Sequence, residues 1–316
     1  MRCIEFAALV AVATLLTGCV SGSASRPLPY LREQGDFFMQ AGIESYNQYN
    51  FALANEQFTH AKNFYGRFDD YLGATHALLN LVQTNLAWGK PDEAASNLAR
   101  ADQLIQQHKL QSQAIYRDLL LSTLYLEANQ SANAEKILTV HDLLMRSNTP
   151  DDTAMALLVN RVRLAQITDQ DFTQWLNLFA QQNSKHNNAE LAARLQRFNA
   201  WQAFLNNDSA QGNQFFETAL NSYRERADPP GLMSTRLEWA QASARTNDWP
   251  QAVTHYEQAL HLAMANNHVP NGLRALEGLR AAYPQAGQQQ KLPQVDEWMN
   301  QLEKLSVNKG NMQERK

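Results

Sequence analysis

The chain has 316 residues, with 27 basic and 31 acidic side chains, a formal net charge of −4 and a pI of about 6.1. This balance excludes the strongly basic class of protein that binds nucleic acid, so we expect no nucleic-acid partner. Asparagine and glutamine together number 57, about as many as all charged residues. We therefore expect contacts made by this amide-rich surface to depend only weakly on salt.

The first nineteen residues have the layout of a secretory leader. A short polar start with one arginine precedes an apolar run over residues 6–16, which is too short to span a bilayer. A buried helix or an ordinary secretory signal would also explain the run by itself. Directly after it, however, comes the tetrapeptide Leu-Thr-Gly-Cys, which ends at Cys19.

This tetrapeptide resembles a bacterial lipobox. The resemblance implies cleavage after a leader of residues 1–18, a lipid on the sulfur of Cys19 and an acylated amine, an anchor with enough chains to be permanent. Val20 stands where many inner-membrane lipoproteins of Gram-negative bacteria carry an aspartate. The resemblance therefore implies a lipoprotein of the outer membrane that faces the periplasm.

Residues 19–33 form a predicted tether. Small residues and two prolines there argue against regular structure. A flexible coil of this length reaches roughly 20 Å, so we expect the folded part to stay close to the membrane.

From residue 34 to residue 305 the apolar spacing is helical throughout, and it predicts seven helix pairs. Pro91, Pro150 and Pro229 stand near predicted helix starts, where a missing backbone N–H costs little. The polar end, residues 306–316, is predicted to be disordered. The predicted pairs are 34–49 with 51–66, 70–88 with 91–108, 112–128 with 131–146, 151–167 with 169–183, 187–206 with 209–227, 230–246 with 250–267, and 270–283 with 290–305.

The second helices share one spacing: a small residue, a large apolar residue four places on, and a small residue three places after that. The large residue falls at 58, 98, 138, 216 and 256, and the steps of 40, 40, 78 and 40 predict a degenerate copy near Leu176, with Phe179 in its last place. A fixed period of this size indicates an array of repeats. The clearest copies are Ala54/Phe58/Ala61, Ala94/Leu98/Ala101 and Ala252/Tyr256/Ala259.

This spacing resembles the tetratricopeptide repeat, in which small residues let two helices approach and the large one fills the space between neighbouring pairs. The resemblance implies an all-α fold, a right-handed solenoid of about seven antiparallel helix pairs. The period of about 40 is longer than the family's 34, so each helix is expected to be about one turn longer.

No motif for catalysis, metal or cofactor binding stands out in the sequence, so we predict no enzyme, no metal and no cofactor. Glu257 and His261 are four apart and could form a pair, but a solvated contact explains them better than a metal site. The acidic pairs at 69–70 and 151–152 are better explained by helix capping than by acid–base chemistry.

The resemblance places the partner on the concave side, which is lined by the first helix of each pair. Tyr46 and Gln83 are among the inner positions, and the predicted partner-binding group lies in repeats four to six, because Arg and Trp are favoured at binding hot spots. A different explanation stays open, in which the arginines only solvate a helix face and the tryptophan is core. The predicted group is Arg161, Arg194, Arg197, Trp201, Gln241 and Arg245.

The resemblance implies a scaffold that binds a cell-envelope protein. Lipoproteins of this type include assembly factors for pilus secretins, activators of peptidoglycan synthases and adaptors for peptidoglycan hydrolases. The alternatives are a module that binds a glycan or small ligand, and an enzyme with an unrecognised site. Binding of an anionic glycan through several arginines would weaken steeply with salt, and the amide-rich surface favours the protein partner.

Overall fold

A computed structural model describes residues 30–147, 149–168, 170, 172–185 and 188–313. The predicted leader, Cys19 and most of the predicted tether lie outside the described residues. Two short 3-10 helices, Gln111–Gln113 and Gln289–Lys291, precede α5 and α15. The α-helices are α1 (Tyr30–Asn47), α2 (Phe51–Gly66), α3 (Tyr71–Trp88), α4 (Pro91–Gln107), α5 (Ala114–Glu127), α6 (Ser131–Val140), α7 (Asp142–Met145), α8 (Asp152–Ile167), α9 (Thr173–Asn183), α10 (Ala189–Leu205), α11 (Ser209–Glu225), α12 (Pro229–Arg245), α13 (Trp249–Ala265), α14 (Val269–Gln285) and α15 (Leu292–Gln313).

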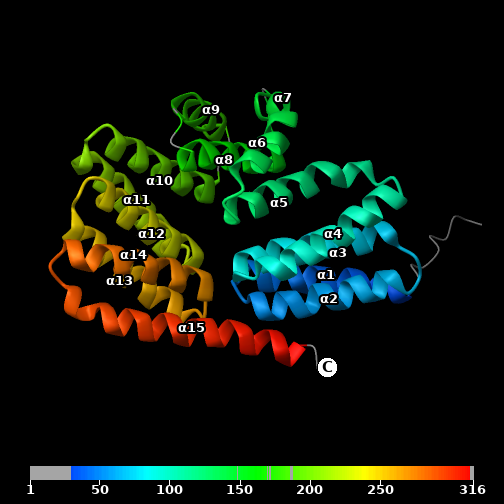
Figure 1. Cartoon of the computed structure of the whole chain (residues 1–316). Helices are drawn as coiled ribbons and strands as arrows, with labels where there is room; N and C mark the ends of the chain where they lie inside the picture. Colours follow the sequence, from blue (N-terminus) through cyan, green and yellow to red (C-terminus); the bar gives the residue numbers. More distant parts are fainter. Residues whose placement is uncertain (1–29, 148, 169, 171, 186–187, 314–316) are drawn as a thin grey trace, which may run out of the picture.

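The predicted all-α repeat fold is confirmed. Helices that are neighbours in the sequence pack against each other along the chain, and the described residues contain no strand. Figure 1 shows the pairs following one another from α1 and α2 to α14 and α15. No helix in the described part of the chain has the length and apolar character needed to cross a membrane.

The turns between helices repeat every 20 residues. Each is marked by a residue in the left-handed region of the backbone, and an Asn or Asp that follows it often caps the next helix through its side chain. The series has a single step of 78 residues across repeat four, the same irregular step that the large apolar residues show. The marked residues are Tyr49, Asp69, Gly89, Lys109 and Asn129, then Asn207, Ala227, Asn247, Asn267 and Gly287.

The large residues of the repeat spacing form the core. Phe58, Leu138 and Phe216 are at most 2% exposed. The small residues allow close packing: a side chain at Gly42 would begin 2.6 Å from the ring of Phe58. The irregular copy in repeat four is also core, since Leu176 and Phe179 are buried.

Several predicted boundaries differ from the structure by one to four residues, among them the start of the second helix of repeat four, which was predicted at 169 and lies at Thr173, and larger differences occur near the C-terminus and in repeat three. α1 begins at Tyr30, not at residue 34, because the last proline before it is Pro29 and nothing after that opposes a helix. α15 continues to Gln313, although residues 306–316 were predicted to be disordered. That segment contains no proline to end the helix. In repeat three, the predicted second helix is divided at His141 into α6 and α7.

The array turns back on itself, so that repeat seven touches repeats two and three. His268, at the start of α14, has its Nε2 3.1 Å from the carbonyl oxygen of Ala87 near the end of α3. Pro270 lies against Gly89, so that a side chain at Gly89 would begin 2.5 Å from the proline ring. Gly89 also holds a left-handed backbone, with φ 75°. The guanidinium of Arg274 pairs with Glu127 at the end of α5. In Figure 1, α12 to α14 lie opposite α1 to α4 across the array.

A buried histidine makes stability depend on pH. His255 stacks on Trp239 with ring centroids 4.0 Å apart, and its Nδ1 lies 2.9 Å from a guanidinium nitrogen of Arg236. Because Arg236 donates to that nitrogen, the ring is neutral. Burial, together with the charge of Arg236, lowers the pKa of His255 to about 4.

We expect stability to fall as the pH is lowered from 6.5 to 4, because the unfolded chain takes up a proton there and the folded chain does not. The loss attributable to His255 is about 3 kcal/mol. His268, whose pKa is also lowered by burial, acts in the same direction. The free energy of unfolding, measured in urea at several pH values, should fall less steeply with decreasing pH in His255→Gln than in the wild type. An unchanged slope in this variant would show that His255 is not responsible.

Candidate functional site: a polar cluster inside the array

Three of the predicted residues lie along one face of α10. Arg194, Arg197 and Trp201 follow each other at helical spacing, and Arg197 reaches across to α12. Its Nε donates to Glu238 at 2.9 Å, and the side chains of Arg197 and Glu238 are only 13% and 19% exposed. Burial acts to lower the pKa of Arg197, but the charge of Glu238 outweighs it and raises that pKa.

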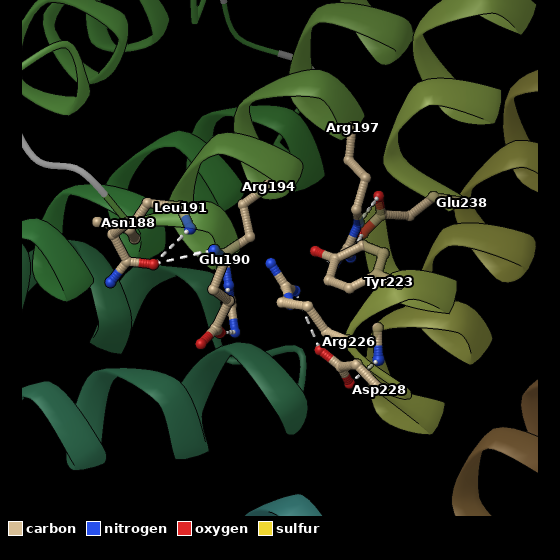
Figure 2. Close-up of polar contacts among 10 residues, drawn as sticks. Asn188, Glu190, Leu191, Arg194, Arg197, Tyr223, Arg226, Asp228 and Glu238 are labelled. Atoms are coloured by element: carbon tan, nitrogen blue, oxygen red, sulfur yellow. Dashed lines mark hydrogen bonds and ion pairs between the residues drawn. The ribbon is translucent and has the colours of Figure 1, made fainter. Parts of the chain in front are cut away.

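A second set of ion pairs lies one turn closer to the start of α10 (Figure 2). Arg194 pairs with Glu190 at 2.7 Å, and this contact lowers the pKa of the Glu190 carboxyl. Arg226, in the turn between α11 and α12, lies 3.2 Å from Asp228 and over the ring of Tyr223. Asp228 also caps α12 by accepting from the backbone N–H of Gly231 at 2.8 Å.

The end of α1 meets these ion pairs from the opposite side of the array. The hydroxyl of Tyr49 lies within electrostatic reach of Asp228, and burial together with the charge of this carboxylate raises the pKa of Tyr49 to about 12. Tyr46 lies within electrostatic reach of Glu190, Arg194 and Asp228. Tyr49 holds a left-handed backbone, with φ 59°, a conformation that costs a bulky residue about 1–2 kcal/mol. We call Tyr46, Tyr49, Glu190, Arg194, Arg226 and Asp228 the inner cluster.

A line of polar side chains extends from the inner cluster along the first helices of repeats one to three. The carboxamide oxygen of Gln83 on α3 accepts from the hydroxyl of Tyr116 on α5 at 2.6 Å. The same side chain lies near the hydroxyl of Tyr46 on α1, whose pKa it acts to lower. Burial raises the pKa of Tyr46 to about 12. Tyr46 and Gln83 are both inner positions predicted by the repeat register.

The other predicted residues occupy different surroundings. Trp201 is 7% exposed and belongs to the apolar core, which matches the alternative left open for it. Arg245 lies over its ring at 5.9 Å, and both line a pocket of about 310 Å³ between α10 and α12. Gln241 is exposed on α12. Arg161 lies apart from the group, where it pairs with Glu135 at 2.6 Å.

Several residues of the inner surface were not anticipated. Arg163, two places after Arg161, is the arginine of repeat four that reaches Glu127, at 2.6 Å, and Arg274 holds the same carboxylate from α14. Burial alone would raise the pKa of Glu127, but the two arginines lower it to about 2. Asp228 was not among the predicted residues; it caps α12 and lies within electrostatic reach of Tyr49, a proximity that has no counterpart in the repeat spacing.

No protein-family model matches the chain, and no curated protein matches it. Among solved structures, the chain is similar to a crystal structure of a Rap protein complexed with competence and sporulation factor. The TM-score is 0.66 at 13% sequence identity, and the match covers 87% of this chain and 76% of the Rap chain. At this identity the likeness establishes the fold: the chain is a tetratricopeptide-like helical repeat.

Proposed function

We propose that the protein is a non-enzymatic scaffold, anchored by a lipid at Cys19 to the outer membrane, whose inner surface binds a segment of a cell-envelope protein. The observation that carries this proposal is the polar character of the contact between the two ends of the array. Repeats two and three meet repeat seven through the hydrogen bond of His268 and the ion pair at Glu127, beside the packing of Pro270 on Gly89. Tyr46 and Tyr49 of repeat one lie within electrostatic reach of the charged residues of the inner cluster.

The buried apolar residues follow a different pattern. Within the described chain, one cluster joins repeats one to three, another joins repeats three to six, and a third joins repeats six and seven. None of the three spans the contact between the two ends. Groups that form hydrogen bonds can replace one partner by water or by a peptide backbone at a small net cost in free energy. Separating an apolar core would instead expose its side chains to water. The inner surface is therefore suited to parting and accepting an extended segment.

The charges of the inner surface favour a protein segment over an anionic glycan. Arg194, Arg197 and Arg226 each pair with a carboxylate, namely Glu190, Glu238 and Asp228 in turn. Because the positive charge is compensated, the surface offers donors and acceptors in similar number. Such a surface matches a peptide backbone and its mixed side chains better than a polymer of like charges.

Two further observations support the proposal. A helical repeat of similar fold, the Rap protein, has been crystallised in complex with competence and sporulation factor, so the architecture is compatible with holding a bound factor; this is an argument by analogy. The lipobox resemblance at Cys19 supports a location of the scaffold in the envelope. We propose roles in pilus secretin assembly or in regulating peptidoglycan synthases or hydrolases.

The proposal is tested by photo-crosslinking in cells. A photoreactive amino acid replaces Arg194 at the inner cluster, and a matched control replaces Gln214, which is exposed on the second helix of the same pair. We expect a discrete protein adduct from position 194 and none from 214, because only the former faces the inner surface. Mass spectrometry of the adduct identifies the partner.

Other outcomes would count against the proposal. Equal labelling from both positions, or labelling from neither, would contradict an inner binding surface. A diffuse glycan-linked ladder from position 194 would replace the protein partner by a glycan. Labelling of cells with a radioactive fatty acid, compared between the wild type and Cys19→Ser, separately tests the anchor.

A further inference from the structure

The first helix of the array exposes aromatic side chains at its N-terminal end. Tyr30 is 69% exposed and Phe37 is 63% exposed. They are seven residues apart, so they lie on the same face of α1, two turns from each other. Among the described helices, every later first helix is covered by a preceding pair, whereas none of the described helices precedes α1 and covers this face.

The exposed rings belong to a larger aromatic surface. Phe37 contacts Phe38 with ring centroids 5.3 Å apart, and Phe38 stacks on Phe64 of α2 at 5.5 Å. His60 adds a further ring 4.9 Å from Phe38, and the guanidinium of Arg67 lies 5.0 Å from the centroid of Phe64. We call Tyr30, Phe37, Phe38, Phe64 and Arg67 the end patch.

An aromatic end patch is unusual for a repeat array. The outer face of a terminal repeat is normally polar, because it has to be soluble. Aromatic rings that are exposed at such a place indicate a site of contact with another protein or with a membrane. Aromatic residues with basic neighbours are typical of the boundary between headgroups and acyl chains, where the ring enters the apolar layer and the cation stays among the phosphates. Arg67, which is exposed beside Phe64, provides a cation at this end, and Arg32, also exposed, lies 3.9 Å from Asp70.

We propose that the end patch is a membrane-contact surface, so that the array rests on the bilayer through α1. This inference rests on the proposed lipid anchor. Ten residues lie between Cys19 and Tyr30, so the start of α1 lies at most about 40 Å from the lipidated residue. The anchor holds the patch beside the bilayer, and the patch sets the orientation, with later repeats projecting into the periplasm.

The test uses the mature chain from Cys19, which has only that cysteine. It is coupled through Cys19 to maleimide lipids in vesicles of phosphatidylethanolamine and phosphatidylglycerol. A photoreactive amino acid replaces Phe37 in one sample and Leu143 in the control. Leu143 is an apolar residue that is 87% exposed on α7, away from the end patch. Lipid adducts are counted by mass spectrometry.

We expect at least about tenfold more lipid adduct from position 37 than from 143, the ratio that corresponds to transferring part of one aromatic ring from water to lipid. Equal yields, or no lipid adduct from either position, would overturn the proposal. An adduct to a second copy of the chain at position 37 would replace the membrane by self-association. Because the lipid is attached chemically, failure here is distinct from failure of cells to lipidate Cys19.

Discussion

Replacing Phe216 with alanine is expected to lower the free energy of unfolding by about 3–5 kcal/mol. Phe216 is fully buried on α11, at the large position of the repeat spacing. Its ring stacks on Trp239 of α12 at 5.4 Å and lies 6.0 Å from the ring of Phe204 on α10. The alanine variant would leave a cavity at the junction of three helices, which can close only if the helices move.

The change is measured by denaturant unfolding, followed by circular dichroism. Phe37→Ala is a matched control, since it removes the same side chain from an exposed site, and we expect an effect within about 0.5 kcal/mol. Because an array loses stability locally, hydrogen exchange should speed up first in α10, α11 and α12. Equal effects of the two substitutions would contradict the role of Phe216 in the core.

Replacing Glu238 with alanine is expected to destabilise the protein by about 3–5 kcal/mol, because it leaves the charge of Arg197 unpaired in a site from which water is largely excluded. The remaining partner of Arg197 is the hydroxyl of Tyr223, at 3.4 Å, which does not neutralise a guanidinium. The expected effect therefore comes mainly from the unpaired charge, and less from the loss of the pair itself.

Two comparisons make this prediction specific. Glu217→Ala removes an exposed carboxylate that pairs with Arg224 at 2.8 Å, and we expect a loss of less than about 1 kcal/mol. The double variant Arg197→Met, Glu238→Leu removes both charges and should recover most of the stability that Glu238→Ala loses. Unfolding of all three is followed in urea. A double variant as unstable as Glu238→Ala would show that the unpaired charge is not the cause.

The helix pairs could be predicted from the sequence because each pair carries its own local signal. Phe58 and Phe216 recur with small residues at fixed spacing, and the spacing fixes both the second helices and their buried face. The irregular copy at Leu176 was also predicted, because the step of 78 residues between two large apolar residues is close to two periods of 40. The start of α1 and the end of α15 were harder to predict, since polar and small residues are compatible with both helix and coil.

The inner surface could be predicted only in part. Repeat register identified Tyr46, Gln83 and Arg194, because inner positions follow from the helix phase. Trp201 shows the limit, since a residue at the edge of the inner face also reaches the core between neighbouring first helices. The contact of Glu127 with Arg274 spans 147 residues. It depends on the accumulated curvature of the whole array, which no local spacing records.

The return of repeat seven to repeats two and three has a consequence for how this protein can evolve. An open array can gain or lose a pair by duplication or deletion in its gene, because only the adjacent pairs must adjust. Here the contacts of His268 with Ala87 and of Pro270 with Gly89 require a fixed number of intervening pairs. Removing 40 residues would shift α14 away from both. Related chains should therefore differ by substitutions and by changes in turns, while their number of repeats stays constant.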